Sequence, residues 1–331
     1  MLGGRGILRP DSTTHRGDDM DDRARFDEFA RLATEQRNPR TMDLDTLDVP
    51  ELLARINDED RLVPEAVARE LPHIATAVDL VVASFRAGGR LVYVGAGSSG
   101  RLGVLDASEC PPTFGSDPEQ VVGVIAGGYS AVVRAVEGAE DRREEGAKAM
   151  DDLAVGPEDT VVGVAASRRT PYVVAAVERA RERGARTVYL TCTPREEFTL
   201  PVDVAICPVV GPEVLMGSTR MKAGTAQKLV LNMISTAAFV RSGKAYENMM
   251  VDLNSSSQKL VERSRRTVMT VTGVSYDEAA RAIEAAGRHV KTAIVMLKRG
   301  CSREEAERLL LRTGGFVRRA IEVGAHDGGG A

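Results

Sequence analysis

The sequence lacks tryptophan, and aromatic residues make up only 4% of its 331 positions. Recognition of a ligand mainly by aromatic stacking is therefore not expected. The cysteines, at Cys110, Cys192, Cys207 and Cys301, are far apart and form no close pair. This spacing argues against a disulfide framework and against the paired cysteines of common zinc sites. The four histidines do not cluster either, so we expect no metal.

A strong excess of one charge is also missing, because 44 basic side chains are balanced by 48 acidic ones. A nucleic-acid or membrane partner would need a concentrated basic face, which the sequence does not show. No apolar run reaches the roughly 20 residues that span a bilayer. The polar N-terminus resembles neither a signal peptide nor an acid-poor transit peptide. We therefore expect a cytoplasmic protein without nucleic-acid or membrane partners.

The pattern of polar and apolar residues divides the chain into regions. Residues 1–26 are polar and aperiodic, which predicts disorder. In residues 27–88 apolar residues recur at helix spacing; Asn57–Asp60 is expected to interrupt these helices and Pro72 to kink or restart the last one. Residues 253–324 indicate helices only, punctuated by glycines, and predict a small C-terminal helical bundle.

Between these regions, residues 89–246 alternate between strand-like and helix-like stretches. Short apolar runs typical of buried parallel strands occur at 90–97, 120–128, 160–167, 186–192 and 203–210. Helical stretches are expected at 99–108, 130–152, 171–184 and 219–242. This alternation predicts an α/β domain in which a mostly parallel sheet lies between helices on both faces, in three layers.

The first candidate loop follows the first strand and reads Gly95–Arg101 (GAGSSGR). It matches the dinucleotide pattern G-x-G-x-x-G, but no acidic residue ends the second strand to bind a ribose. A simple phosphate fits better. Glycine at Gly97 lets backbone N–H groups approach, Ser98 and Ser99 offer hydroxyls, and a helix N-terminus follows. The alternative is a tight turn that binds nothing.

The second candidate loop, Ala166–Pro171, also follows a strand directly. Ser167 and Thr170 offer hydroxyl groups, and Thr170 with Pro171 is typical of a helix start. A capped helix start without a ligand explains these residues equally well. The recurrence of Ser/Thr-rich loops at two strand ends nevertheless favours one polyhydroxylated, phosphorylated ligand bound from both sides.

A third polar segment, Gly217–Lys228 (GSTRMKAGTAQK), precedes a long apolar helix. Ser218 and Lys222 are candidate phosphate ligands, and Lys228 and Asn232 are candidates to face the same cleft. The alternative for each side chain is a solvated helix entrance.

Together these loops resemble the N-acetylmuramic acid 6-phosphate etherase family, over about Thr34 to Ala320. The resemblance rests on the following stretches: NDED (57–60), GAGSSGR (95–101), LDASECPP (105–112), AVEGAED (135–141), AASRRTPY (165–172) and GSTRMKAGTAQK (217–228). It implies the sugar-phosphate isomerase-like (SIS) fold and a homodimer. It also implies a carbon–oxygen lyase that needs no metal or redox cofactor and acts on a sugar phosphate.

The implied reaction removes D-lactate from C3 of N-acetylmuramic acid 6-phosphate, by elimination followed by hydration. It requires one carboxylate that takes the C2 proton and one carboxylic acid that protonates the leaving oxygen. The resemblance implies Glu109 as the proton donor and Glu140 as the other acid–base group. Pro111-Pro112 predicts a helix end near Glu109, where the helix dipole and burial would keep the carboxyl protonated. Glu140 alone, within a charge run, would not stand out.

The sequence departs from the family pattern at Arg168, where a glycine is usual, and at Thr219, where a serine is common. Arg168 would either crowd the phosphate or add a contact to it. Two alternative functions remain: an aldose–ketose sugar-phosphate isomerase on the same fold, and a sugar-phosphate-sensing regulator. The isomerase would release no lactate, and the regulator would need a partner-binding element that the sequence does not show.

Overall fold

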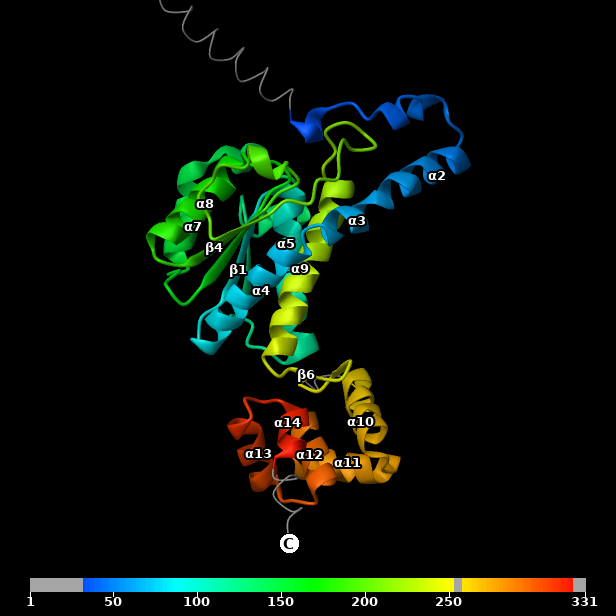
Figure 1. Ribbon diagram of the computed structural model, residues 1–331, viewed down its shortest axis with the longest axis vertical. Helices are drawn as coiled ribbons and strands as arrows, with labels where there is room; N and C mark the ends of the chain where they lie inside the picture. Colours follow the sequence, from blue (N-terminus) through cyan, green and yellow to red (C-terminus); the bar gives the residue numbers. More distant parts are fainter. Residues whose placement is uncertain (1–31, 253–257, 324–331) are drawn as a thin grey trace, which may run out of the picture.

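The computed structural model describes residues 32–252 and 258–323 (Figure 1). The predicted disorder of residues 1–26 therefore lies outside the described residues. The N-terminal part contains short 3-10 turns and helices: η1 (Ala33–Glu35), η2 (Pro39–Thr41), η3 (Leu44–Thr46), α2 (Val49–Asp60), α3 (Leu62–Ala68) and α4 (Leu71–Arg86). Pro72 lies in the first turn of α4, which confirms the predicted restart. Asn57–Asp60 does not interrupt a helix; it forms the last turn of α2, and the break follows at Arg61.

The central part of the chain alternates strands and helices. Its elements are β1 (Leu91–Gly95), α5 (Gly97–Phe114), β2 (Val121–Ile125), α6 (Ser130–Val133), η4 (Ala139–Asp141), α7 (Arg143–Asp152), β3 (Thr160–Val164), α8 (Pro171–Glu182), β4 (Arg186–Leu190), η5 (Arg195–Glu197), β5 (Val204–Ile206) and α9 (Lys222–Arg241). The predicted helix over 130–152 is wrong as one element. α6 ends at Val133, because Arg134 after it is extended (φ −140°, ψ 147°), and Gly138, with a φ of 71°, lies in the turn that leads into η4 and α7.

The strands form a parallel sheet in the order β2-β1-β3-β4-β5 within the described residues. Side chains alternate between its two faces. Leu91 and Tyr93 of β1 lie in the core that includes α4, α5 and α9, whereas Val92 and Val94 pack with α7 and α8. The sheet therefore lies between two helical layers, which confirms the predicted α/β fold with parallel strands.

The C-terminal part begins with a short antiparallel pair, β6 (Ala245–Tyr246) and β7 (Met249–Met250), which leads into a helical bundle. Its helices are α10 (Gln258–Thr272), α11 (Tyr276–Ala285), α12 (Val290–Arg299), α13 (Arg303–Arg312) and α14 (Val317–Glu322). The bundle has its own apolar core and lies beyond the C-terminal end of α9 (Figure 1). The predicted bundle is confirmed, whereas the exact domain limits remain a prediction.

Candidate functional site

The order of the strands places two of the candidate loops side by side. β2 follows β1 in the chain and pairs on one side of it, whereas β3 pairs on the other side. The chain thus changes direction between β1 and β3. Ligands of open parallel sheets bind beyond the carboxyl ends of the strands at such a switch point. The loop after β1 and the loop after β3 begin at the paired residues Gly95 and Val164, so both border this position.

In the first loop, the backbone at Gly97 is open to close approach by a ligand. Gly97 has a φ of 52° and is exposed, and a Cβ atom built on it would meet nothing within 4 Å. α5 begins at Gly97, and Ala96 before it provides no side-chain cap. The first N–H groups of a helix have no partner within the helix. Together with the half-buried Ser98, they can donate to an anion at this end of α5.

The side chain of Ser99 is not exposed for direct contact with a ligand. It is buried, and its hydroxyl donates to Oε1 of Gln227 on α9 over 2.9 Å. Gln227 is 1% exposed, and its Nε2 has no hydrogen-bond partner among the described residues. Sequence reasoning did not select Gln227, although it lies in the motif Gly217–Lys228. Its position in this polar motif, about one turn after the start of α9, is the signal that could have found it.

The second loop presents another helix N-terminus. Thr170 occupies the N-cap position of α8 with Pro171 after it, as predicted, but the Thr170 side chain makes no cap hydrogen bond. Ser167 and Thr170 are both half-buried. Arg168 is directed toward η5, where its guanidinium donates to the backbone carbonyl of Glu197 and lies 3.7 Å from the carboxylate of Glu197. The side chain that replaces the usual glycine thus has contacts outside the loop.

A cavity of about 170 Å³ connects the first loop with Glu140. Gly97 and Arg101 line it from α5, and Glu140 lines it from η4. Arg101 is the single cation among the described lining residues, and its Nε donates to the carbonyl of Val132 over 3.0 Å. Buried Ala139 packs in the core with α8 and holds η4 in place. The structure therefore brings together Gly97 and Glu140, two of the predicted site residues.

Glu109 does not share this cavity. α5 continues through Pro111 and Pro112 to Phe114, and Glu109 is exposed. The predicted helix end and the predicted burial of Glu109 are both wrong for the single chain, because the helix accepts the two prolines. Glu109 is twelve residues after Gly97, which is about 18 Å along the helix axis.

The third segment differs from its prediction at Lys222. This side chain is fully buried, and its Nζ lies 2.7 Å from a carboxylate oxygen of Glu59 and 3.0 Å from the carbonyl oxygen of Val210. A lysine engaged in this way is not a phosphate ligand, so that prediction is corrected. Ser218 remains half-buried in the loop before α9.

The N-terminus of α9 is occupied by a carboxylate of the chain itself. Glu213 is 1% exposed and accepts hydrogen bonds from the N–H groups of Lys222 and Ala223, each over 2.9 Å. Burial raises the pKa of Glu213, although these N–H donors act in the opposite direction. Because this helix end is already filled, the candidate anion sites that border the switch point in the described part of the chain are the N-termini of α5 and α8.

Glu59 joins the N-terminal segment to α9. Its carboxylate accepts hydrogen bonds from Arg40, Lys222 and Asn38. The hydrogen bond from Arg40, helped by those from Lys222 and Asn38, outweighs burial and lowers the pKa of Glu59 to about 2. Within the motif Asn57–Asp60, Glu59 thus connects the N-terminal segment to α9.

Asn232 does not face the candidate cleft either. Its Nδ2 donates to buried Asp106 on α5 over 2.6 Å, and the same carboxylate accepts from the hydroxyl of Tyr93 over 2.9 Å. Lys228 is exposed on α9. Asn232, Asp106 and Tyr93 hold α9, α5 and β1 together.

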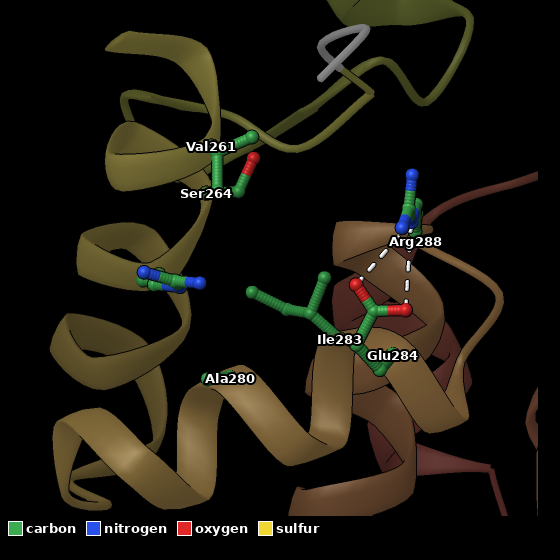
Figure 2. A pocket seen from close by; sticks show the side chains of 7 residues that line it. Val261, Ser264, Ala280, Ile283, Glu284 and Arg288 are labelled. Atoms are coloured by element: carbon green, nitrogen blue, oxygen red, sulfur yellow. Dashed lines mark hydrogen bonds and ion pairs between the residues drawn. The ribbon is translucent and has the colours of Figure 1, made fainter. Parts of the chain in front are cut away.

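Another cavity, of about 180 Å³, lies between α10 and α11 in the bundle (Figure 2). The charged side chains that line it form ion pairs. Arg288 pairs with Glu284, which also lines the cavity, and Arg265 pairs with Glu262, which does not. No group of three potential metal ligands occurs in residues 32–252 and 258–323. None of the helices in this part of the chain has the length and apolar character of a membrane span. The switch point therefore remains the candidate site.

Two domain families match this chain. The model of the glucokinase regulatory protein N-terminal SIS domain matches residues 73–181, and the SIS domain model matches residues 142–237. These ranges contain the parallel sheet and its loops.

Two relatives match this chain over about 90% of its length. The chain is 62% identical over 298 residues to the N-acetylmuramic acid 6-phosphate etherase of Salinibacter ruber, covering 90% of this chain and 96% of that protein. It is 54% identical over 297 residues to the N-acetylmuramic acid 6-phosphate etherase of Mycolicibacterium smegmatis, covering 90% of this chain and 100% of that protein. Among solved structures, a phosphoheptose isomerase from Francisella tularensis matches with a TM-score of 0.45 and 17% identity, covering 59% of this chain and 100% of that chain.

Proposed function

Because the chain belongs to the N-acetylmuramic acid 6-phosphate etherase family, we propose that it cleaves the D-lactyl ether of N-acetylmuramic acid 6-phosphate. The products are N-acetylglucosamine 6-phosphate and D-lactate. The observation that carries the proposal is the cavity at the switch point, because it joins the open N-terminus of α5 at Gly97 with the carboxylate of Glu140. The proposal includes a cytoplasmic location.

The phosphate is proposed to bind between the N-termini of α5 and α8. Gly97 and Ser98 contribute from the first loop, and Ser167 and Thr170 from the second. Both helix ends lack a side-chain cap, so their N–H groups and positive dipole ends are available to a dianion. Ser218 is proposed as a further contact from the loop before α9. Ser99 acts from its buried position, through the placement of this loop.

The sugar is proposed to react in its open-chain form, in which the C1 aldehyde acidifies the C2 proton. Glu140 takes this proton as the C3–oxygen bond breaks, and Glu109 protonates the departing lactate oxygen. The intermediate has a double bond between C2 and C3. Water then adds its hydroxyl to C3 while C2 regains a proton, so the net reaction consumes one water. Arg101 supplies a positive charge in the cavity lining, beside the carboxylates of Glu137 and Glu140.

Glu109 is proposed to come from a second copy of the chain. Within one chain it lies about 18 Å along α5 from Gly97 and outside the cavity. It is exposed, and Leu105, one turn before it on the same helix face, is an exposed apolar residue. A homodimer that packs this face beside the partner's switch point would bring both carboxyl groups to one substrate.

Labelled water can show which carbon–oxygen bond breaks and where water adds. In H₂¹⁸O with deuterium oxide, elimination and hydration place ¹⁸O at C3 and deuterium at C2 of the aminosugar product, while lactate keeps its original oxygen. Mass spectrometry of both products measures this. Label in the hydroxyl of lactate instead would contradict the elimination. An aldose–ketose isomerase would give deuterium exchange without lactate, and a regulator would give binding without either.

A further inference from the structure

A third cavity lies at the opposite end of α9 from the candidate site, where the sheet domain meets the C-terminal bundle. It measures about 610 Å³. Five cationic side chains line it: Arg86, Arg241, Lys244, Arg312 and Arg319. Arg86 and Arg241 lie in the last turns of α4 and α9, and Arg312 and Arg319 in the last turns of α13 and α14. The cavity therefore collects positive charge from both parts of the molecule.

These charges are poorly compensated. No carboxylate is present among the described residues that line the cavity. The side chains of Arg86, Arg241 and Arg312 form no hydrogen bond or ion pair with any described residue, and all three residues are exposed. Lys244 is the exception, since it lies 3.1 Å from Asp252, a carboxylate that it shares with Lys291. The cavity in the bundle differs, because there Arg288 is neutralised by Glu284 over 3.2 Å (Figure 2).

A basic residue in a last helical turn interacts favourably with the helix dipole, and this explains each arginine separately. It does not explain why four helices direct such turns to one cavity. Like charges that share a cavity repel one another, and an anion between them would convert this repulsion into attraction.

The remaining lining residues indicate what kind of anion would fit. Phe85 and Phe316 line the cavity beside the cations, and the guanidinium of Arg319 lies 4.3 Å from the centre of the Phe316 ring. Arginine is well suited to phosphate groups, because its planar donors contact two oxygens at once. The volume admits a phosphate group together with a small ring.

We propose that this junction cavity binds a small phosphorylated metabolite with at least two negative charges. Arg86 and Arg241 contact it from the sheet domain, and Arg312 and Arg319 from the bundle. The two parts already approach closely here, since a Cβ atom on Gly243 would lie 2.9 Å from the carbonyl oxygen of Gly314. A bound anion therefore holds the bundle against the sheet domain and regulates their relative position.

The test is isothermal titration of the full chain with pyrophosphate at low ionic strength. The variant Arg241→Gln/Arg312→Gln removes one cation from each part. The control Arg308→Gln/Arg318→Gln removes the same charge from α13 and α14 at residues outside the cavity lining. Wild type and control are expected to bind alike, and the test variant about tenfold more weakly or worse.

Thermal unfolding without ligand provides the second readout. Relief of repulsion and loss of the favourable helix-dipole interactions oppose one another, so the Arg241→Gln/Arg312→Gln variant is expected to unfold close to the wild-type temperature. Weaker binding by a variant that unfolds there cannot be ascribed to misfolding. Equal affinity in both variants would locate pyrophosphate at the helix N-termini of α5 and α8 and overturn the proposal, as would the absence of saturable binding to wild type. Glucose 6-phosphate and AMP, titrated in the same way, distinguish a sugar phosphate from a nucleotide.

Discussion

Gln227 connects α9 to the loop at Gly95–Arg101, the proposed phosphate loop, through one hydrogen bond to Ser99. Both side chains are buried, so the bond restricts the rotamer of Ser99 and the position of the loop around it. The unpaired Nε2 of Gln227 lies within the same buried region. Gln227 is therefore a positioning residue of the proposed site, acting through Ser99.

We predict that Gln227→Ala raises KM for the phosphorylated substrate more than it lowers kcat, because the proposed phosphate loop loses the hydrogen bond that supports it. Steady-state kinetics measure the two constants separately. The control Thr225→Ala lies on the same helix but is exposed, with its hydroxyl bonded within α9. An unchanged KM in a folded Gln227→Ala protein would contradict the positioning role.

Glu59 and Lys222 form a buried ion pair, with side chains 3% and 0% exposed. Removing one partner of such a pair leaves a buried charge without compensation. We predict that Glu59→Gln lowers the free energy of unfolding by about 3 to 5 kcal/mol. Urea denaturation at neutral pH measures it. The neighbouring Asp58→Asn, at an exposed ion pair, should change stability little.

The same pair predicts a pH dependence. The pKa of Glu59 is lowered to about 2 by the hydrogen bond from Arg40 and by those from Lys222 and Asn38. A lowered pKa contributes stability above the unfolded value, and this stability is lost as pH falls through the folded value. The difference between wild type and Glu59→Gln should therefore shrink from about pH 4.5 downward to about pH 2. A difference that stays constant over this range would contradict it.

At the scale of elements, the N-terminus of α5 depends on the left-handed conformation of Gly97. Gly97→Ala is expected to cost about 1 to 2 kcal/mol of stability. Its Cβ, in open space beside the helix end, should also hinder the phosphate and raise KM. Gly128→Ala is a matched control, because Gly128 has a φ of 70° and equally open surroundings. Chemical denaturation and kinetics should show equal destabilisation in both variants and a raised KM only for Gly97→Ala.

An element could be predicted from the sequence when the residues that determine it lie close together in the chain. The apolar runs of β1 to β5 are visible in sequence because strands buried on both faces need continuous apolar residues. The helix end expected near Glu109 was wrong because packing retains α5 through Pro111 and Pro112. Lys222 could not be placed correctly, since its partner Glu59 lies 163 residues away in the chain.

The candidate site was predictable only in part. The loops at Gly97 and Thr170 were found because both follow apolar runs and precede helix starts. The arrangement of Glu140 beside Gly97 depends on strand order and on the turn at Gly138, and neither is encoded in a short window of sequence. The family resemblance supplied Glu140 where residue patterns alone did not.

At the scale of the whole molecule, the proposed active site needs two chains. We predict that Glu109→Gln and Glu140→Gln are each inactive but complement one another when mixed and reassembled. Random exchange makes half of the dimers mixed, and each mixed dimer has one intact site of two, so about a quarter of wild-type activity should return. If both glutamates acted within one chain, mixing would restore nothing, and the proposed role of the partner would be wrong.

The most direct test of the account is to incubate the purified protein with N-acetylmuramic acid 6-phosphate and to measure D-lactate enzymatically. We predict release of D-lactate with an equal amount of N-acetylglucosamine 6-phosphate, and a loss of about 100-fold or more in the Glu140→Gln variant. Binding of the sugar without lactate, in a folded wild-type protein, would contradict the proposed etherase activity.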